Sequence, residues 1–224
     1  MKSAVKSSKV NRAWLNDHVN DTYVKLAKKE GYRARAAYKL QEIDETLHLI
    51  KPGQLVVDLG SAPGAWSQYV RRQLSPKSAT GGGAAAGELN GRIIALDLLP
   101  MEAIEGVLFL QGDLREDAVL VQLAEHMQGQ LADVVLSDMA PNLSGISSAD
   151  AARIENLIEL ALDFAQNHLK AEGALVAKVY HGGSYDALYQ RFRDTFVTVK
   201  RIKPKASRDK SSETFLVGMQ LKKS

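Results

Sequence analysis

The apolar positions of this chain form short uninterrupted runs that alternate with stretches of helical periodicity. The runs are rich in Val, Ile, Leu and Ala, which is typical of strands buried on both faces of a sheet. They predict strands over 54–60, 92–97, 107–113, 132–138 and 173–180. In the stretches between them, apolar residues recur three or four positions apart. These stretches predict helices from about 65, over 114–127, over 150–169 and over 184–194.

Two further apolar runs, 196–203 and 214–221, follow each other near the end of the sequence without a helical stretch between them. We therefore expect them to be antiparallel neighbours, whereas strands joined through helices are parallel. Strands alternating with helices indicate an α/β protein. The pattern as a whole predicts a Rossmann-like fold, with a seven-stranded, mostly parallel sheet, helices on both faces and an antiparallel last strand.

The first residues of the chain differ from the rest. Residues 1–22 have little apolar periodicity and are predicted to form a flexible basic arm, followed by a single domain over 23–224. Apolar residues return at helical spacing over 32–49, and the sequence KPG at 51–53 ends that predicted helix. Residues 75–90, rich in Gly, Ala and Ser, are predicted to be a low-complexity surface insertion.

The charge of the chain is distributed unevenly. The net charge is +3, but residues 1–40 hold ten Lys/Arg against three Asp/Glu, and residues 191–224 repeat those numbers. The middle, 41–190, holds nine basic against twenty acidic residues. Basic ends around an acidic middle suit a chain whose ends bind a polyanion. Two solvated basic faces would give the same counts, and charge alone does not separate the two readings.

Several classes of protein are disfavoured by what the sequence lacks. There is no cysteine, which excludes disulfides, thiolate metal sites and cysteine nucleophiles. No apolar segment has the length of a signal peptide core or of a membrane span, so we expect a cytoplasmic protein without a membrane partner. The five histidines are scattered without ligand spacing, and no metal site is predicted.

The ends of the predicted strands carry the candidate chemistry, because ligands of such sheets bind at the carboxyl ends of the strands. Gly60 and Gly64 follow the first strand in DLGSAPGAW, a loop unlike the dinucleotide-binding G-x-G-x-x-G. Acidic residues end four strands. They are Asp58, Asp97, Asp113 and Asp138. One such Asp is commonly a turn former, but four in register suit a cationic adenosine ligand, S-adenosylmethionine.

Seven segments in order, from about 25 to 221, resemble the bacterial FtsJ-type ribosomal RNA methyltransferases. They are GYRARAAYKLQEID, VVDLGSAPGAWSQ, IIALDLLP, FLQGD, SDMAPN, AKVY and SRDKSSETFLV. The resemblance implies methyl transfer from S-adenosylmethionine to the 2′-hydroxyl of a uridine in 23S rRNA of the large ribosomal subunit, by a protein that we expect to be a monomer. A transferase for tRNA or another structured RNA, or a non-catalytic RNA-binding assembly factor, stays as an alternative.

The resemblance also implies the site residues. The family's Lys-Asp-Lys-Glu tetrad falls on Lys39, Asp138, Lys178 and Glu213. Its cofactor-binding positions fall on Gly64, Trp66, Asp97, Asp113 and Asp138. The sequence departs from the family pattern in the 75–90 insertion and in YHGGSYD at 180–186, which leaves the RNA contacts beside Lys178 open.

The chemistry of the reaction gives Lys178 a possible task of its own. A ribose 2′-hydroxyl is a weak acid that must be aimed at the methyl group and lose its proton as the new bond forms. An amine can accept that proton only when neutral, and burial beside a second ammonium lowers the pKa of a lysine. We therefore expect Lys178 to be a proton acceptor with a lowered pKa. A protonated Lys178 that only positions the hydroxyl is the alternative.

The basic residues near Lys39 and Glu213 are the candidate RNA contacts. If both tetrad members border the active site, the clusters next to them flank its mouth and suit the phosphates of a structured RNA. The residues predicted to contact RNA are Arg33, Arg35, Lys200, Arg201, Lys203, Lys205 and Arg208.

Overall fold

The computed structural model describes residues 21–75, 88–141, 147–182, 184–208 and 211–222. Its helices are α2 (Thr22–Glu30), α3 (Ala36–Leu47), α4 (Ala65–Leu74), α5 (Asp117–Met127), α6 (Ser147–His168) and α7 (Tyr185–Thr195). Its strands are β1 (Leu55–Leu59), β2 (Arg92–Asp97), β3 (Val107–Gln111), β4 (Ala132–Ser137), β5 (Leu169–Tyr180), β6 (Phe196–Ile202) and β7 (Glu213–Leu221). Residues 1–20 of the predicted arm and 76–87 of the predicted insertion lie outside the described residues.

The strands form one seven-stranded sheet in the order β3-β2-β1-β4-β5-β7-β6. Strand β7 lies between β5 and β6 and is antiparallel to both, while the other pairings are parallel. This confirms the predicted architecture, including the antiparallel last strand. The β5–β7 register pairs Lys178 with Phe215 and Tyr180 with Glu213. The start of β7 therefore lies at the carboxyl end of β5.

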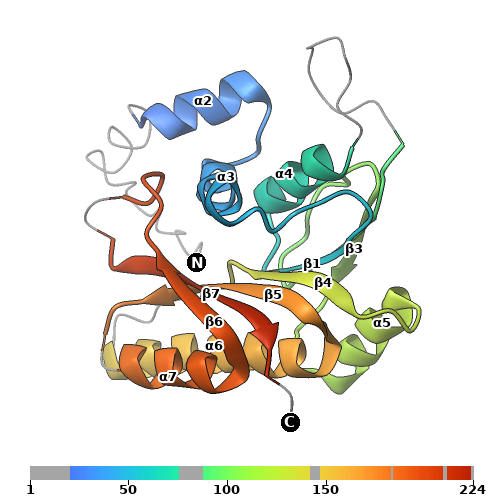
Figure 1. Cartoon of the computed structure of the whole chain (residues 1–224). Helices are drawn as coiled ribbons and strands as arrows, with labels where there is room; N and C mark the ends of the chain where they lie inside the picture. Colours follow the sequence, from blue (N-terminus) through green and yellow to red (C-terminus); the bar gives the residue numbers. More distant parts are fainter. Residues whose placement is uncertain (1–20, 76–87, 142–146, 183, 209–210, 223–224) are drawn as a thin grey trace, which may run out of the picture.

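Helices cover both faces of the sheet (Figure 1). Helices α3 and α4 lie on one face, with α2 beyond them, and α6 and α7 lie on the other. Each face has its own apolar core. Val56, Val176 and Phe215 belong to the core on the α3 side, whereas Val57 and Val179 belong to the core on the α6 side. Successive strand residues thus alternate between the two cores, as the pleat of a strand requires.

The N-terminal segment differs from the sequence prediction. Helix α2 was not predicted, and the helix expected from residue 32 begins only at Ala36. The Asp21 side chain caps α2 by accepting hydrogen bonds from the backbone N–H groups of Tyr23 and Val24, at 2.9 and 3.3 Å. Gly31, with φ +75°, ends the helix in the left-handed conformation. The chain over 31–35 is therefore a link between two helices.

The described residues contain neither a membrane-spanning helix nor a cluster of metal-binding side chains. No helix there is both long and apolar enough to cross a membrane. No group of three or more His, Cys, Asp or Glu side chains in the same residues is placed to hold a metal ion.

Candidate active site

The tetrad residues converge because of strand alternation. Lys178 follows Val176 two positions along β5, so its side chain lies on the face covered by α3. Glu213 stands in the same relation to Phe215 on β7, and Asp138 to Leu136 just beyond the end of β4. Helix α3, which packs on this face, carries Lys39. Three strand ends and one helix thus bring the four side chains to one edge of the sheet.

The first of two ion pairs joins Lys178 and Asp138. The Lys178 ammonium lies 2.9 Å from Oδ1 of Asp138 and donates a hydrogen bond to the backbone carbonyl of the same residue at 2.6 Å. The Lys178 side chain is 7% exposed and that of Asp138 is 21% exposed. Asp138 therefore holds Lys178 through both a charge and a backbone acceptor.

The second ion pair joins Lys39 and Glu213. The Lys39 ammonium lies 2.6 Å from Oε1 of Glu213, and both side chains are largely buried. The Ser207 hydroxyl donates to the same carboxylate oxygen at 2.9 Å. Burial raises the pKa of Glu213, but the charge and hydrogen bond of Lys39, the Ser207 hydroxyl and the charge of Lys178 lower it below the ordinary value. Glu213 is thus kept ionised.

The pKa of Lys178 differs from the sequence prediction. Burial lowers the pKa, as expected, but the charge of Asp138, the Tyr180 phenol, the hydrogen bond to Asp138 and the charge of Glu213 outweigh it, and the net direction is upward. The expected lowering was wrong because each lysine of the tetrad has its own carboxylate. With its pKa raised, Lys178 is an ammonium at neutral pH.

The two glycines of the loop after β1 are placed where side chains do not fit. Gly60 has φ +75°, and a Cβ there would lie 2.8 Å from backbone atoms of Met139. Gly64 has φ +109° at the start of α4, and a Cβ there would lie 2.8–3.0 Å from Ile104, Arg33 and Met101. The glycines let this loop pack against the chain segments that follow β4 and β2.

The predicted cofactor carboxylates hold backbone and side-chain partners in the structure. Asp97 accepts hydrogen bonds from the N–H groups of Ala62 and Leu99, both at 2.8 Å, and so ties the loop after β1 to the loop after β2. Asp113 pairs with Arg115, whose guanidinium lies 2.5 Å from Oδ2, and this pairing lowers the pKa of Asp113. Both carboxylates remain predictions as cofactor contacts.

Trp66 points into the core. Its side chain is 3% exposed, packs against the Phe215 ring at 5.7 Å and donates its indole N–H to the carbonyl of Ala36 at 2.8 Å. The indole therefore braces α4 against α3. What this position can offer a ligand is its backbone at the first turn of α4, where the N–H groups of a helix are free of intrahelical partners.

Asp58 adds a buried carboxyl to the same edge. It is fully buried, its Oδ2 accepts a hydrogen bond from the Ser67 hydroxyl at 2.6 Å, and its Oδ1 has no hydrogen-bond partner among the described residues. Burial raises the pKa of Asp58 to about 7; the Ser67 hydrogen bonds oppose the rise, and the charges of Asp138 and Asp97 add to it. Carboxylates concentrated in this way fit a cationic ligand such as S-adenosylmethionine.

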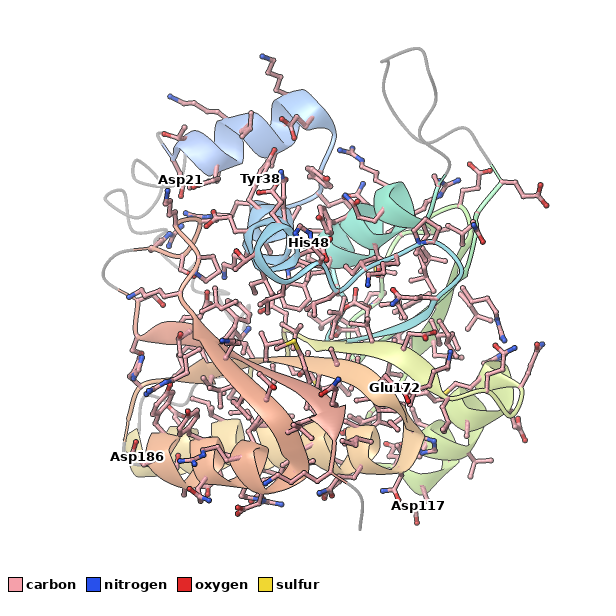
Figure 2. The ribbon with its side chains drawn as sticks, in the orientation of Figure 1. Asp21, Tyr38, His48, Asp117, Glu172 and Asp186 are labelled. Carbon is pink, nitrogen blue, oxygen red and sulfur yellow. The ribbon has the colours of Figure 1, made fainter. Side chains whose placement is uncertain are left out.

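The predicted RNA contacts divide into two kinds. The guanidinium groups of Arg33 and Arg35 are engaged by the protein itself. Arg33 donates to the carbonyls of residues 63, 102 and 103 at 2.7–3.0 Å. Arg35 pairs with Asp21, which lies just before α2 (Figure 2), and donates to the carbonyl of Ala206. As RNA contacts, both stay predictions.

The basic residues near β7 lie at the surface, on different sides. Lys200 and Ile202 share one face of β6, and Ile202 packs into the core on the α3 side. Arg201 points to the other face, where its guanidinium lies 4.6 Å from the centre of the Tyr189 ring of α7. Lys203, Lys205 and Arg208 are exposed in the segment between β6 and β7 that leads to Glu213.

Two neighbours of the tetrad were not singled out from the sequence. Ser207 hydrogen-bonds Glu213, and Tyr180 interacts electrostatically with Lys178. A sequence signal existed for Tyr180, because it lies two positions after Lys178 on a strand and so shares its face. Ser207 lies in a segment without periodicity; its only sequence signal was its place at the start of the family-like segment SRDKSSETFLV.

Comparisons with known proteins identify the family of this chain. A family model described as FtsJ-like methyltransferase matches residues 32–221. A protein of Albidiferax ferrireducens called ribosomal RNA large subunit methyltransferase E is 81% identical over 99% of both chains, and one of the same name from Paracidovorax citrulli is 70% identical over 100% of both. A solved structure from Plasmodium falciparum, 27% identical, superposes with a TM-score of 0.71 over 85% of this chain and 98% of that chain. The chain belongs to the FtsJ-like methyltransferase family.

Proposed function

We propose that this chain transfers a methyl group from S-adenosylmethionine to the ribose 2′-hydroxyl of a uridine in 23S rRNA of the large ribosomal subunit. The observation that carries the proposal is the meeting of two ion pairs, Lys178–Asp138 and Lys39–Glu213, at the carboxyl edge of the sheet. The names of the relatives, which are large-subunit ribosomal RNA methyltransferases, support this class of RNA.

The cofactor would be held by residues of the strand-end loops. These are Gly64 and the first turn of α4, together with Asp97, Asp113 and Asp138. S-adenosylmethionine supplies an electrophilic methyl group on a positively charged sulfur. The carboxylates suit the positive charges of this ligand, and the glycines allow close approach to the backbone.

The tetrad would act on the ribose. Lys178 accepts the proton of the 2′-hydroxyl, and it does so in its neutral form, which is the minor form at neutral pH because of the raised pKa. Asp138 fixes the amine in place through its carboxylate and its backbone carbonyl. Lys39 and Glu213 are paired with each other and largely buried, so their side chains are held in place and can position the ribose for the reaction.

Transfer of labelled methyl groups tests the proposal. Purified protein is incubated with tritiated S-adenosylmethionine and, in separate reactions, with naked 23S rRNA, large subunits or whole ribosomes from a strain that lacks its own copy of the enzyme. We expect label at one uridine ribose. The K178M variant should keep cofactor binding and lose transfer, and R193K, on the far side of the sheet, should keep both.

The alternatives give different results in the same assay. Label that appears in tRNA or in another structured RNA, and not in 23S rRNA, would replace the proposed substrate. Binding of RNA without any transfer by the wild-type chain would indicate an assembly factor. A protein with the proposed substrate works among ribosomes in the cytoplasm, and we propose that it does so as a monomer.

A further inference from the structure

The Arg33 side chain joins the two loops that follow β1 and β2. Its Nη1 donates to the carbonyl of Pro63 at 3.0 Å and to that of Glu102 at 2.7 Å, and its Nη2 donates to the carbonyl of Ala103 at 3.0 Å. Pro63 belongs to the glycine loop, and the other two acceptors lie in the segment over 98–106, which has no helix or strand. One guanidinium thus holds both loops.

Arg33 is itself fixed in place. Its backbone N–H donates to the side-chain oxygen of Gln68 on α4 at 2.8 Å, and the Gln68 amide donates to the carbonyl of Gly31 at 3.1 Å. A Cβ on Gly64 would lie 2.9 Å from Nη1 of Arg33, so the guanidinium packs directly on the start of α4. The side chain is 21% exposed.

The Arg33 side chain is not arranged like one that is free to bind a phosphate group. A phosphate contact needs donors that point to solvent, whereas three hydrogen bonds of Arg33 are directed at carbonyls of the protein. The same two loops are also joined by Asp97, which accepts hydrogen bonds from Ala62 and Leu99. Both residues therefore hold the two loops together, Arg33 by donating hydrogen bonds and Asp97 by accepting them.

We propose that Arg33 is a positioning residue for the cofactor: it holds the loops over 60–64 and 98–104 at the spacing that the cofactor requires. The proposal rests on the proposed function in one respect, that these loops bind S-adenosylmethionine. A planar guanidinium reaches three carbonyls on two segments at once, and the ammonium of a lysine does not reproduce that geometry. Arg33 is thus assigned to the cofactor side of the active site.

The R33K variant separates this role from phosphate binding, because lysine keeps the positive charge but lacks the planar set of N–H donors of the guanidinium. We expect the affinity for S-adenosylhomocysteine, measured by titration calorimetry, to fall about tenfold in R33K, the order expected for lost supporting hydrogen bonds. Affinity for a large-subunit RNA fragment should stay within about twofold. In kinetics, the KM for S-adenosylmethionine should rise, with kcat and the KM for RNA nearly unchanged.

R72K is the matched control. Arg72 lies on α4, donates to the carbonyl of Glu30 at 2.6 Å and lies over the Tyr32 ring, and both of these partners are outside the two loops. Amide hydrogen exchange without ligand gives a second reading, in which R33K should exchange faster over 60–64 and 98–104 and R72K should not. Thermal unfolding of each variant checks the fold.

Three results would overturn the proposal. Unchanged affinity for S-adenosylhomocysteine and unchanged exchange in R33K would show that Arg33 holds nothing. Loss of RNA affinity alone would make Arg33 a phosphate contact. A wild-type chain that binds no S-adenosylhomocysteine would overturn the proposed function and, with it, this role of Arg33. Because the wild type is measured before any variant, this result is distinguished from a failure of the Arg33 proposal alone.

Discussion

Replacing Asp138 by asparagine removes the charge that stabilises the Lys178 ammonium and keeps the shape of the side chain. Removing one partner of a buried ion pair costs roughly 3–5 kcal/mol. Asp138 is 21% exposed, and its backbone carbonyl keeps its 2.6 Å hydrogen bond to Lys178. We therefore expect D138N to lower the free energy of unfolding at pH 7 by about 2 kcal/mol, below the fully buried range.

The loss should depend on pH in a definite direction. The pKa of Lys178 is raised in the folded protein, so its contribution to stability is fully present below the unfolded pKa and is lost as pH rises through the folded value. Without the Asp138 charge, the folded-state pKa of Lys178 should be lower in D138N than in wild type. The difference between wild type and D138N should therefore be largest at pH 7 and shrink above about pH 10.4.

Urea unfolding followed by circular dichroism at pH 7 to 11 measures both effects. D133N is the control, because Asp133 stands at the other end of β4 and pairs with Lys170, which is 46% exposed. The asparagine side chain of D133N can still accept the 2.8 Å hydrogen bond that the Leu55 backbone N–H donates to the other carboxylate oxygen, so the substitution removes mainly the ion pair. That pair should be worth less than about 1 kcal/mol. Equal losses in the two variants, or a D138N loss that does not change with pH, would refute the electrostatic account of the Lys178–Asp138 pair.

Three further predictions concern the charges around the site. Lys39 and Ser207 outweigh burial and lower the pKa of Glu213, so the contribution of this carboxylate to stability is present above the unfolded pKa and is lost as pH falls. Urea unfolding should therefore show that E213Q has a lower free energy of unfolding than wild type at pH 7. The difference should disappear below about pH 4. Asp58 has the opposite effect. Its pKa is raised to about 7 in the folded protein, so the wild type loses stability as pH rises from about 4 to about 7, and the same method should show D58N gaining on wild type over that range. The double variant K203M/K205M should lower the slope of log affinity for RNA against log salt by about two in a filter-binding titration, and an unchanged slope would exclude these lysines from the interface.

The succession of strands and helices along the chain, and the placing of Asp138 and Lys178 at the ends of strands, could be predicted from the sequence, because both follow from local rules. Continuous apolar runs mark strands with two covered faces, and period-two alternation places Lys178 on the same face as Val176. Helix α2 escaped prediction because only Val24 and Ala27 are buried along it. Its ends, Asp21 and Gly31, are ordinary cap residues, but a short helix depends on tertiary packing for its stability.

The charge state of the site could not be predicted in the same way. A run such as ALVAKVY shows that Lys178 is buried, and burial alone lowers the pKa of a lysine. The opposite result depends on the Asp138 carboxylate at 2.9 Å and on Glu213, which is supplied by a distant strand. Which of two opposing effects prevails is a matter of distances that only the folded chain defines.

The same limitation applies to the basic residues. A count of Lys and Arg treats Arg33 and Lys205 as equal, yet Arg33 directs its donors to protein carbonyls, whereas the Lys205 side chain is exposed in the segment that leads to Glu213. The tetrad itself consists of two ammonium–carboxylate pairs with no net charge. Under the proposed function, we therefore expect exposed basic residues outside the tetrad to attract the RNA, and we predict that affinity for RNA and transfer of the methyl group can be separated by mutation.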